Sequence, residues 1–362
     1  MRTVGIVTFH RAHNYGAILQ VFALQTKLKE LGYDVKVIDY KNEAIDRQYK
    51  LIRLNRGCIK EDLKYFTINQ KRFRIFKKFI KNNLELSKEY SLDELKSNAP
   101  KYDVYITGSD QVWNIKLVKA LDDIYTLNFG DNKVKRISYA ASIGNSDISK
   151  SEENEYKNKL NRMNFISVRE EKAKELLEPI LNRKISVVLD PTLLIPSYKW
   201  DEFIPKEKII KEKYILTYVV EENLEYRKII KELCKRTGLK VICFERKKYI
   251  DDDNVISNEY FRDPFEFVNL IKYAEYVVTT SFHATVFSII FNKKFVVIPH
   301  IVTGNRVSNL LEMLRIKDRA VTTLNEFKNI NIDKEDNYEE INKILEYERS
   351  KSIEFIKNSI EK

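Results

Sequence analysis

The sequence predicts an α/β protein that contains two doubly wound parallel sheets. Short runs rich in β-branched residues alternate with segments of helical periodicity, a pattern typical of parallel-sheet architecture. At 362 residues, the chain is long for a single hydrophobic core. Residues 190–200, "DPTLLIPSYKW", hold two of the seven prolines and separate two series of predicted strands. We therefore expect two domains that meet near this segment.

Six strands are predicted before that boundary and four after it. The first strand leads into a helix at residues 17–31, whose apolar residues fall on one stripe. Other helices lie between the strands, one is expected near 305–316, and a charged helix covers about 335–361. The predicted strands are 4–9, 35–40, 103–108, 136–142, 165–170 and 185–190, followed by 214–220, 239–245, 275–281 and 294–300.

Composition excludes several classes of protein. A hydrophobic content of 43%, with 21 Tyr and 19 Phe, predicts a packed core rather than disorder. No run of about 18 apolar residues occurs, and the opening "MRTVGIVTF" is typical of a strand rather than a signal peptide. The three cysteines form no C-x-x-C pair, which fits a reduced compartment. The sequence therefore predicts a cytoplasmic protein.

The net charge of +11, which is 64 basic minus 53 acidic residues, comes largely from one segment. Residues 47–84 carry twelve basic side chains against Glu61 and Asp62. Residues 68–84 are predicted to form a helix. This helix either packs its phenylalanines on its own domain or rests on the inner membrane leaflet. A nucleic-acid surface is a third interpretation. The helix interleaves Phe73, Phe76, Ile80 and Leu84 with Lys71, Arg72, Lys77, Lys78 and Lys81.

The residues that follow the first strand are candidates for a binding site, because doubly wound sheets bind ligands at the carboxyl ends of their strands. Gly16 permits close approach of a ligand to the backbone, and the next helix directs its N–H groups there. His10, His13 and Asn14 could bind a phosphate or a carboxylate. The pattern is not G-x-G-x-x-G, so it lacks the dinucleotide fingerprint. The alternative is a turn glycine with two surface histidines.

A second candidate follows the third strand, in "TGSDQVWN". Asp110, Gln111 and Asn114 can hydrogen-bond sugar hydroxyls, and Trp113 offers a flat apolar face. The alternative is an Asx-turn beside a core tryptophan. Ser142, after the fourth strand, is small enough to permit close approach of a ligand.

Charged and imidazole side chains follow three further strands. Arg169 offers a fork for a carboxylate or phosphate, or forms a surface salt bridge with a neighbouring glutamate. Ser281 and His283 precede an almost wholly apolar helix, so His283 is either a proton donor that faces a cleft or a core histidine. Arg306, in the first turn of a later helix, is an anion ligand or a surface residue. We find no H-E-x-x-H pattern, and we expect no metal site.

Taken together, six segments resemble the polysaccharide pyruvyl transferase family. The resemblance runs in order from the first strand to about residue 316, and no single motif would suffice for it. It implies two Rossmann-like domains that face each other across a cleft, similar to GT-B glycosyltransferases, with the C-terminal helix able to pack back on the first domain. The segments are "TFHRAHNYGAILQVFALQ", "TGSDQVWN", "YAASIG", "SVREEKAKELL", "VLDPTLL" and "TTSFHATVFSIIFNKKF".

The resemblance also implies a reaction and roles for residues. Characterised members move a pyruvyl group from phosphoenolpyruvate onto sugar hydroxyls as a cyclic ketal and release phosphate, without a cofactor. Arg169 matches the family's donor-binding arginine, and His283 matches its histidine. Many members have an arginine where this chain has Ser281, so Arg306, His10 or His13 would fill that place.

The predicted organisation assigns one substrate to each domain. Residues 1–195 form the acceptor side, with a basic helical insertion at about 45–98; residues 205–325 form the donor side, and 335–362 form the C-terminal helix. The expected partner is a glycan or lipid-linked saccharide rather than a nucleic acid. The alternative function is a GT-B-type glycosyltransferase that uses a nucleotide sugar, with Arg262 and Glu266 as candidate ligands. The acceptor sugar, the general base and the oligomeric state stay open.

Overall fold

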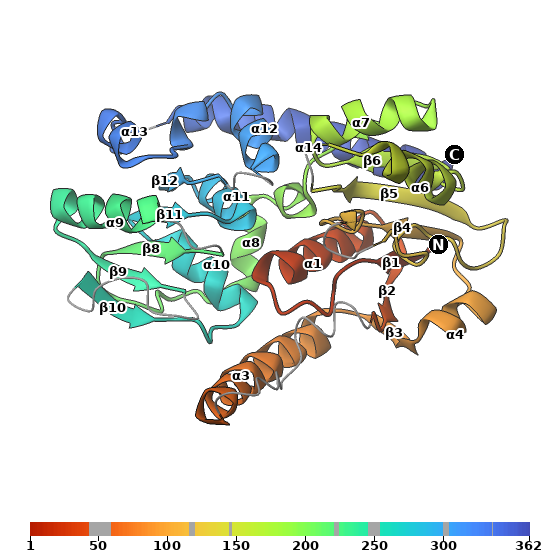
Figure 1. Ribbon diagram of the computed structural model, residues 1–362, viewed down its shortest axis with the longest axis horizontal. Helices are drawn as coiled ribbons and strands as arrows, with labels where there is room; N and C mark the ends of the chain where they lie inside the picture. Colours follow the sequence, from red (N-terminus) through yellow and green to blue (C-terminus); the bar gives the residue numbers. More distant parts are fainter. Residues whose placement is uncertain are drawn as a thin grey trace. The chain divides into compact units, whose positions relative to one another are not determined.

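The structure, a computed structural model, describes two compact units. It covers residues 1–42, 59–115, 120–144, 147–220, 224–244, 254–299, 304–334 and 336–362, the side chains of 59–65 excepted. Unit 1 comprises Met1–Leu194 and Glu348–Lys362, and unit 2 comprises Ile195–Tyr347. Each unit contains one parallel sheet with helices packed around it (Figure 1). The predicted α/β fold with two parallel sheets is confirmed. The cleft between the two strand edges stays a prediction.

Unit 1 contains a seven-stranded sheet in the order β3-β2-β1-β4-β5-β6-β7. Every neighbouring pair is parallel. All of β4 and nearly all of β5 are buried, as expected for central strands covered on both faces. The strands are β1 (Thr3–Val7), β2 (Asp34–Tyr40), β3 (Leu86–Tyr90), β4 (Val104–Thr107), β5 (Lys135–Ala141), β6 (Phe165–Val168) and β7 (Ser186–Val187).

The helices of unit 1 begin at recognisable caps. Asn14 caps α1 by accepting hydrogen bonds from the backbone N of Gly16 and Ala17, and Ser149 forms a capping box with Glu152 on α6. The helices are α1 (Tyr15–Glu30), α3 (Ile59–Asn83), α4 (Leu92–Ser97), α6 (Lys150–Leu160), α7 (Glu171–Leu181) and the 3₁₀ turn η1 (Pro191–Leu194).

Unit 2 contains a five-stranded parallel sheet in the order β10-β9-β8-β11-β12. Its strands are β8 (Tyr214–Tyr218), β9 (Lys240–Cys243), β10 (Val255–Asn258), β11 (Tyr276–Thr279) and β12 (Lys294–Val297). Its helices are α8 (Ser197–Phe203), α9 (Leu224–Thr237), α10 (Pro264–Tyr273), α11 (Phe282–Ile290), α12 (Asn305–Met313), η3 (Lys317–Arg319) and α13 (Leu324–Asn329).

The C-terminal helix α14 (Tyr338–Glu361) belongs to unit 1 from Glu348 onward. Its Ser352 Oγ accepts a hydrogen bond from the backbone N of Leu189 at 3.0 Å, and the carbonyl of Ile360 accepts one from Lys135 Nζ at 2.8 Å. The expectation that this helix packs back on the first domain is therefore confirmed for its second half.

The expected basic insertion contains more than a helix. Within about 45–98 the chain forms α3, β3 and α4, whereas residues 43–58, including part of the basic run, lie outside the described residues. Helix α3 packs Phe76 against Tyr15 and Phe79 against Phe22, so its apolar side faces α1 of the same unit. No helix in the described part of the chain is long and apolar enough to cross a membrane.

Each sheet has one point where the strand order reverses. In unit 1 the chain runs outward from β1 to β3 and then returns to β4 beside β1; in unit 2 it returns from β10 to β11 beside β8. Ligands of doubly wound sheets bind beyond the carboxyl ends of the strands at such a switch point. The candidate sites are therefore the loops after β1 and β4 in unit 1 and after β8 and β11 in unit 2.

Candidate functional site

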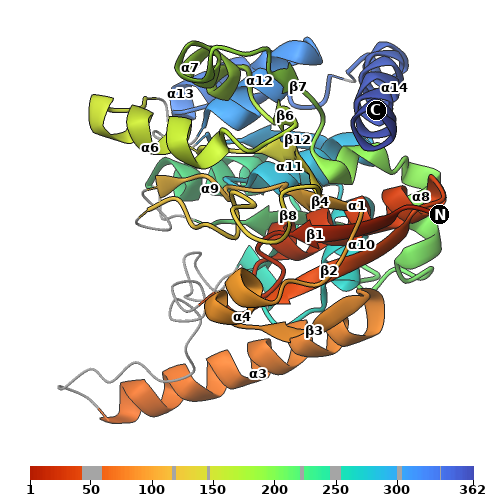
Figure 2. The ribbon, with the colours of Figure 1, turned by 90° about the vertical axis from the view of Figure 1, so that its right-hand side faces the viewer.

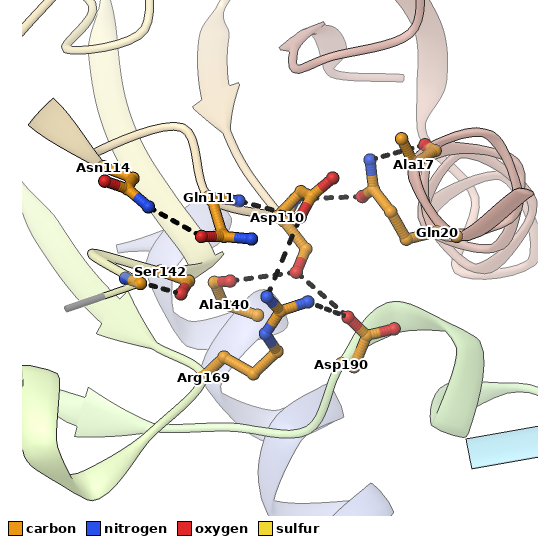
Figure 3. A network of polar contacts seen from close by, with 12 residues as sticks. Ala17, Gln20, Asp110, Gln111, Asn114, Ala140, Ser142, Arg169 and Asp190 are labelled. Carbon is orange, nitrogen blue, oxygen red and sulfur yellow. Dashed lines mark hydrogen bonds and ion pairs between the residues drawn. The ribbon is translucent and has the colours of Figure 1, made fainter. Parts of the chain in front are cut away.

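A buried polar network lies beyond the strand ends at the switch point of unit 1 (Figure 3). Ser109 ties its parts together. The backbone N of Ser109 donates to Gln20 Oε1 at 3.1 Å, and its carbonyl accepts from Thr8 Oγ1 at 2.9 Å. Its Oγ lies 2.9 Å from the carbonyl of Ala140 and 3.2 Å from Asp190 Oδ2, and it can donate to either. The loop after β4 is thus fixed to α1, β5 and the segment after β7.

The backbone of this network is strained. Asp110 and Ala140 have φ angles of 77° and 50°, which residues other than glycine rarely adopt. Gly108 has a φ of 106°, and a Cβ there would lie 2.3 Å from the carbonyl oxygen of Tyr139, so only glycine fits. Strain of this kind persists where the surroundings impose it, and it concentrates at functional sites. The loop after β4 therefore has two features typical of a functional site, a strained backbone and a set of polar side chains.

Arg169 is buried among three carboxyl groups. Its Nη1 donates to Asp190 Oδ2 at 2.8 Å, while its Nη2 lies 3.8 Å from Asp110 Oδ1 and its Nε lies 3.9 Å from Glu170 Oε2. Burial alone would lower the pKa of the guanidinium, but the charges of Asp190, Asp110 and Glu170 outweigh it and raise that pKa. The guanidinium is therefore held as a cation inside the protein. The surface salt bridge that was the alternative interpretation is therefore corrected to a buried network.

The three carboxyl groups differ in access to solvent. Asp190 and Glu170 side chains are 0% and 3% exposed, whereas the side chain of Asp110 is 15% exposed. Three carboxyl groups against one guanidinium leave this end of unit 1 acidic rather than cationic. Such a set is suited to hydrogen-bonding hydroxyl groups more than to binding an anion. This differs from the donor-binding role that the resemblance implies for Arg169.

Amide and hydroxyl groups complete the network. Asn114 Nδ2 donates to Gln111 Oε1 at 2.7 Å, and a Cβ on Gly144 would lie 2.2 Å from that oxygen. Ser142 Oγ donates to Glu170 Oε1 at 2.7 Å, and it accepts from the backbone N of Gly144 at 3.1 Å. The structure therefore brings together four of the predicted residues, namely Asp110, Gln111, Asn114 and Ser142, with Arg169 beneath them (Figure 3).

Trp113 is not exposed at the strand ends, where it was predicted to stack on a sugar. Its side chain is fully buried in the core of unit 1, and its Nε1 donates to the carbonyl of Tyr125 at 3.0 Å. A ring enclosed in this way offers no face to a ligand. The structure corrects the prediction in favour of the core tryptophan, because the apolar ring gains more from packing than the loop position suggested.

His10 is buried and held between two oxygens. Its Nε2 lies 2.8 Å from Asp39 Oδ1, and its Nδ1 lies 3.1 Å from the carbonyl of Thr8. Arg11 Nε also donates to Asp39 Oδ1 at 2.7 Å. Burial would raise the pKa of Asp39, but the hydrogen bonds from His10 and Arg11 lower it to about 2. Both ring nitrogens of His10 are thus occupied by the protein, and neither is directed at a ligand.

His13 faces the basic helix rather than the strand ends. Its ring lies 5.3 Å from that of Phe73 and 5.7 Å from that of Phe76, and its carbonyl accepts from Arg72 Nη2 at 3.0 Å. Burial and the nearby Arg72 charge lower the pKa of His13 to about 4, so the imidazole is neutral at pH 7. The structure separates the two histidines that the sequence placed together, while Asn14 and Gly16 form the cap of α1.

The switch point of unit 2 presents a histidine and an arginine around a phenylalanine. Ser281 caps α11 by accepting from the backbone N of Ala284, and its own N donates to Thr279 Oγ1 at 3.0 Å. His283 and Phe282 occupy the first turn, with ring centroids 5.2 Å apart. The guanidinium carbon of Arg306, in the first turn of α12, lies 5.8 Å from the Phe282 centroid. His283 and Phe282 are each 8% exposed, so both side chains are largely buried and only a small part of each is open to solvent.

Several residues of the two switch points were absent from the sequence prediction. They lie within segments that the sequence analysis singled out, but their roles depend on tertiary contacts. They are Ser109, Glu170 and Asp190 in unit 1 and Phe282 in unit 2. Asp190 could have been found from the sequence, because it is a carboxylate shortly after a strand, like Asp110. Over the described residues, no group of three His, Cys, Asp or Glu side chains is arranged to hold a metal ion.

Comparisons with solved structures show the same fold in enzymes of low sequence identity. S. aureus MnaA, solved with UDP, is 14% identical, with a TM-score of 0.52 over 99% of this chain and 96% of that one. A putative UDP-N-acetylglucosamine 2-epimerase from Listeria monocytogenes is 9% identical, with a TM-score of 0.55 over 98% and 95%. The Methanocaldococcus jannaschii UDP-GlcNAc 2-epimerase is 15% identical, with a TM-score of 0.50 over 95% and 98%. The fold is therefore GT-B-like, as predicted.

Comparison of the sequence itself identifies the family. No curated protein matches the chain. The sequence model of the family named polysaccharide pyruvyl transferase matches residues 14–300, which include the loops after β4, β8 and β11 and every predicted site residue from Asn14 to His283. With most of its length matched, this chain belongs to the polysaccharide pyruvyl transferase family and is a transferase.

Proposed function

We propose that this enzyme transfers the pyruvyl group of phosphoenolpyruvate to two hydroxyls of a sugar in a cell-surface polysaccharide or its precursor. The observation that carries the proposal is the family match over residues 14–300, joined to a hydroxyl-binding network in unit 1 and an anion-binding set in unit 2. The reaction uses no cofactor, and it takes place in the cytoplasm. The finer assignments below rest on the chemistry of each switch point.

The acceptor sugar binds at the network of unit 1. Asp110 is the most exposed of the three carboxyl groups around Arg169, and its backbone is held in a strained conformation by the surrounding loop. Gln111, Asn114 and Ser142 supply amide and hydroxyl groups at the same place. We assign Asp110 as the general base for the acceptor hydroxyl, and we assign Arg169 as a positioning residue that holds Asp110 and Asp190 in place.

The donor binds at the switch point of unit 2. Arg306 supplies a cation for the phosphate or carboxylate of phosphoenolpyruvate, and the positive ends of the α11 and α12 helix dipoles add to it. Ser281, where many members have arginine, caps α11 and adds no charge, so Arg306 provides the positive charge here. His283, in the first turn of α11, is assigned as the acid that protonates the methylene carbon.

The proposed reaction balances without a redox step. His283 adds a proton to the methylene carbon, which becomes a methyl group, and the enol carbon becomes cationic. One sugar hydroxyl attacks that carbon and gives its proton to Asp110. The bond between the enol carbon and the phosphate oxygen then breaks, and phosphate leaves with the proton that Asp110 received. The second hydroxyl closes the ketal and returns a proton to His283. Two hydroxyl protons are lost, one gained by carbon and one by phosphate.

Thermal stability tests the donor directly. Phosphoenolpyruvate is expected to raise the melting temperature, and phosphate is expected to be released only when a glycan acceptor from a panel is also present. Treatment with EDTA should leave the rate unchanged. A UDP-sugar that stabilises the protein and is consumed, while phosphoenolpyruvate has no effect, would replace the proposal with a glycosyltransferase.

The side chains that the glycosyltransferase alternative requires are engaged within unit 2. Arg262 pairs with Glu259 and with Glu266 at 2.5 Å and 3.2 Å. Glu266 also accepts a hydrogen bond from the backbone N of Asp263 in the capping box of α10. These contacts stabilise the start of α10, so a structural role explains the presence of both Arg262 and Glu266. The pyruvyl transfer proposal is therefore favoured over the nucleotide-sugar alternative.

A further inference from the structure

Helix α3 has one face that packs on unit 1 and an opposite face that is strongly basic. The helix runs along an edge of unit 1, beside β2 and β3 (Figures 1 and 2). Phe76 and Phe79 are buried against Tyr15 and Phe22 of α1. Arg72 is buried with them, and its guanidinium carbon lies 4.9 Å from the centroid of the Tyr15 ring. One side of the helix is therefore fully accounted for by packing.

The cations of α3 that face solvent in the structure differ from those named in the sequence analysis. Arg72, which the sequence placed among the exposed basic residues, is buried and donates to the carbonyl of His13. Arg74 is exposed instead. At 100° per residue, the exposed basic positions fall within an arc of about 120°, opposite Phe76 and Phe79. We call this set the basic arc; its members are Lys71, Arg74, Lys77, Lys78 and Lys81.

Three members of the basic arc lack the glutamate partners that lysines of other described helices have. Lys27, Lys228 and Lys343 each pair with a glutamate three or four residues away on the same helix. No Asp or Glu occurs between Leu63 and Leu84. Within the described part of the chain, Arg74, Lys78 and Lys81 have no carboxylate at salt-bridge distance. Like charges collected on one arc repel each other, and an external anionic surface would relieve that repulsion.

We propose that the basic arc docks this enzyme on an anionic lipid bilayer. A straight helix presents its cations along about 15 Å, which suits a flat surface of headgroups. Phe73 and Ile80, both half-buried, border the arc and supply the apolar margin typical of interfacial helices. A single-stranded nucleic acid fits less well, because no aromatic side chain lies within the arc to stack on a base. The proposal concerns docking and does not depend on the donor or the reaction.

Flotation with vesicles tests the proposal without any substrate. We would use the full chain with phosphatidylcholine vesicles containing about 30% phosphatidylglycerol, at low and at high salt. Replacing all five arc residues by glutamine is expected to reduce the bound fraction at low salt by at least about tenfold. Binding should also fall at high salt and be absent on vesicles of phosphatidylcholine alone.

A matched variant separates the arc from net charge. Lys101, Lys133, Lys150, Lys157 and Lys184 are exposed residues of unit 1 outside α3, and replacing them by glutamine removes the same five charges. This control should bind the vesicles within about twofold of the original chain. An equal loss in both variants, or unchanged binding by the arc variant, would overturn the proposal. So would arc-dependent binding to polyuridylate with none to the vesicles. Melting curves establish that both variants are folded.

Discussion

At the scale of single residues, the network around Arg169 shows how position along the chain and role in the structure can differ. The strand-end rule correctly placed Asp110, Gln111, Asn114, Ser142 and Arg169 at one edge of the sheet. It could not show that Asp190 would lie 2.8 Å from Arg169, because the two are brought together by the return of the chain through α7 and β7. The donor-binding role that the resemblance implies for Arg169 stays a prediction, and the structure shows that its guanidinium lies in a buried ion cluster.

His283 is the residue whose loss should affect the chemistry most. If it protonates the methylene carbon, His283→Ala is expected to lower kcat by about 10²–10⁴-fold, because proton transfer then depends on water. The side chain lies at the start of α11 and is slightly exposed, so the melting temperature should stay close to that of the original chain. Steady-state rates at saturating donor provide the measurement. A near-normal kcat would remove His283 from the mechanism.

Arg169 is expected to act on stability and acceptor binding rather than on donor binding. Arg169→Met leaves Asp190, Asp110 and Glu170 without their cation and should lower the unfolding free energy by about 3–5 kcal/mol. In the double variant with Asp190→Asn, the loss should be smaller than the sum of the two single losses. Arg169→Lys, which keeps the charge, should retain the original KM for the donor. A raised donor KM in that variant would instead support a donor clamp.

His13 predicts a specific dependence of stability on pH. Its pKa is about 4 in the folded protein against an ordinary value of 6.5, because of burial and the Arg72 charge. Between these values the unfolded chain binds a proton that the folded chain does not, so stability falls as the pH drops from 6.5 to 4 and no further below that.

The measurement for His13 is denaturant unfolding of the original chain and of His13→Gln at several pH values. Relative to the variant, the original chain should lose at most about 3 kcal/mol between these limits. Parallel curves for the two proteins across this range would show that His13 titrates normally and is not enclosed by α3.

At the scale of elements, the sequence indicated every central strand and two of the four edge strands, β7 and β12. All ten predicted strands are present, and all of them except β7 contain buried apolar residues. The two missed strands, β3 and β10, lie at the open edges of their sheets. β3 reads "LSKEY" and β10 reads "VISN", and a strand paired on one side needs less apolar character. Such strands form because a neighbour supplies hydrogen bonds, which local sequence does not report.

The attachment of α3 to unit 1 makes a prediction at this scale. Phe76→Ala is expected to lower the unfolding free energy by about 3–5 kcal/mol, because the ring is fully buried between α3 and α1. Phe73→Ala, at a half-buried position of the same helix, should cost less and serves as the control. Denaturant unfolding gives both values. Equal small losses would mean that α3 is held by contacts other than its phenylalanines.

At the scale of the whole molecule, two parallel sheets each present a different chemistry at the switch point. The network of unit 1 combines carboxyl, amide and hydroxyl groups, and unit 2 combines a histidine, an arginine and two helix N-termini. The sequence could indicate both locations, since both follow strands that it predicts. It could not show the acidic character of the first, which depends on side chains from three separate strand ends. This division of roles is the basis for assigning the acceptor to unit 1 and the donor to unit 2.

The fate of the donor's atoms tests the central claim of pyruvyl transfer. Phosphoenolpyruvate with heavy oxygen between its enol carbon and phosphorus would be supplied with a glycan acceptor in deuterated water, and both products analysed by mass spectrometry. The account predicts that the heavy oxygen leaves in the phosphate and that the glycan gains one pyruvyl group whose methyl carries a single deuterium. Heavy oxygen found in free pyruvate, with the glycan unchanged, would contradict it by showing hydrolysis at phosphorus.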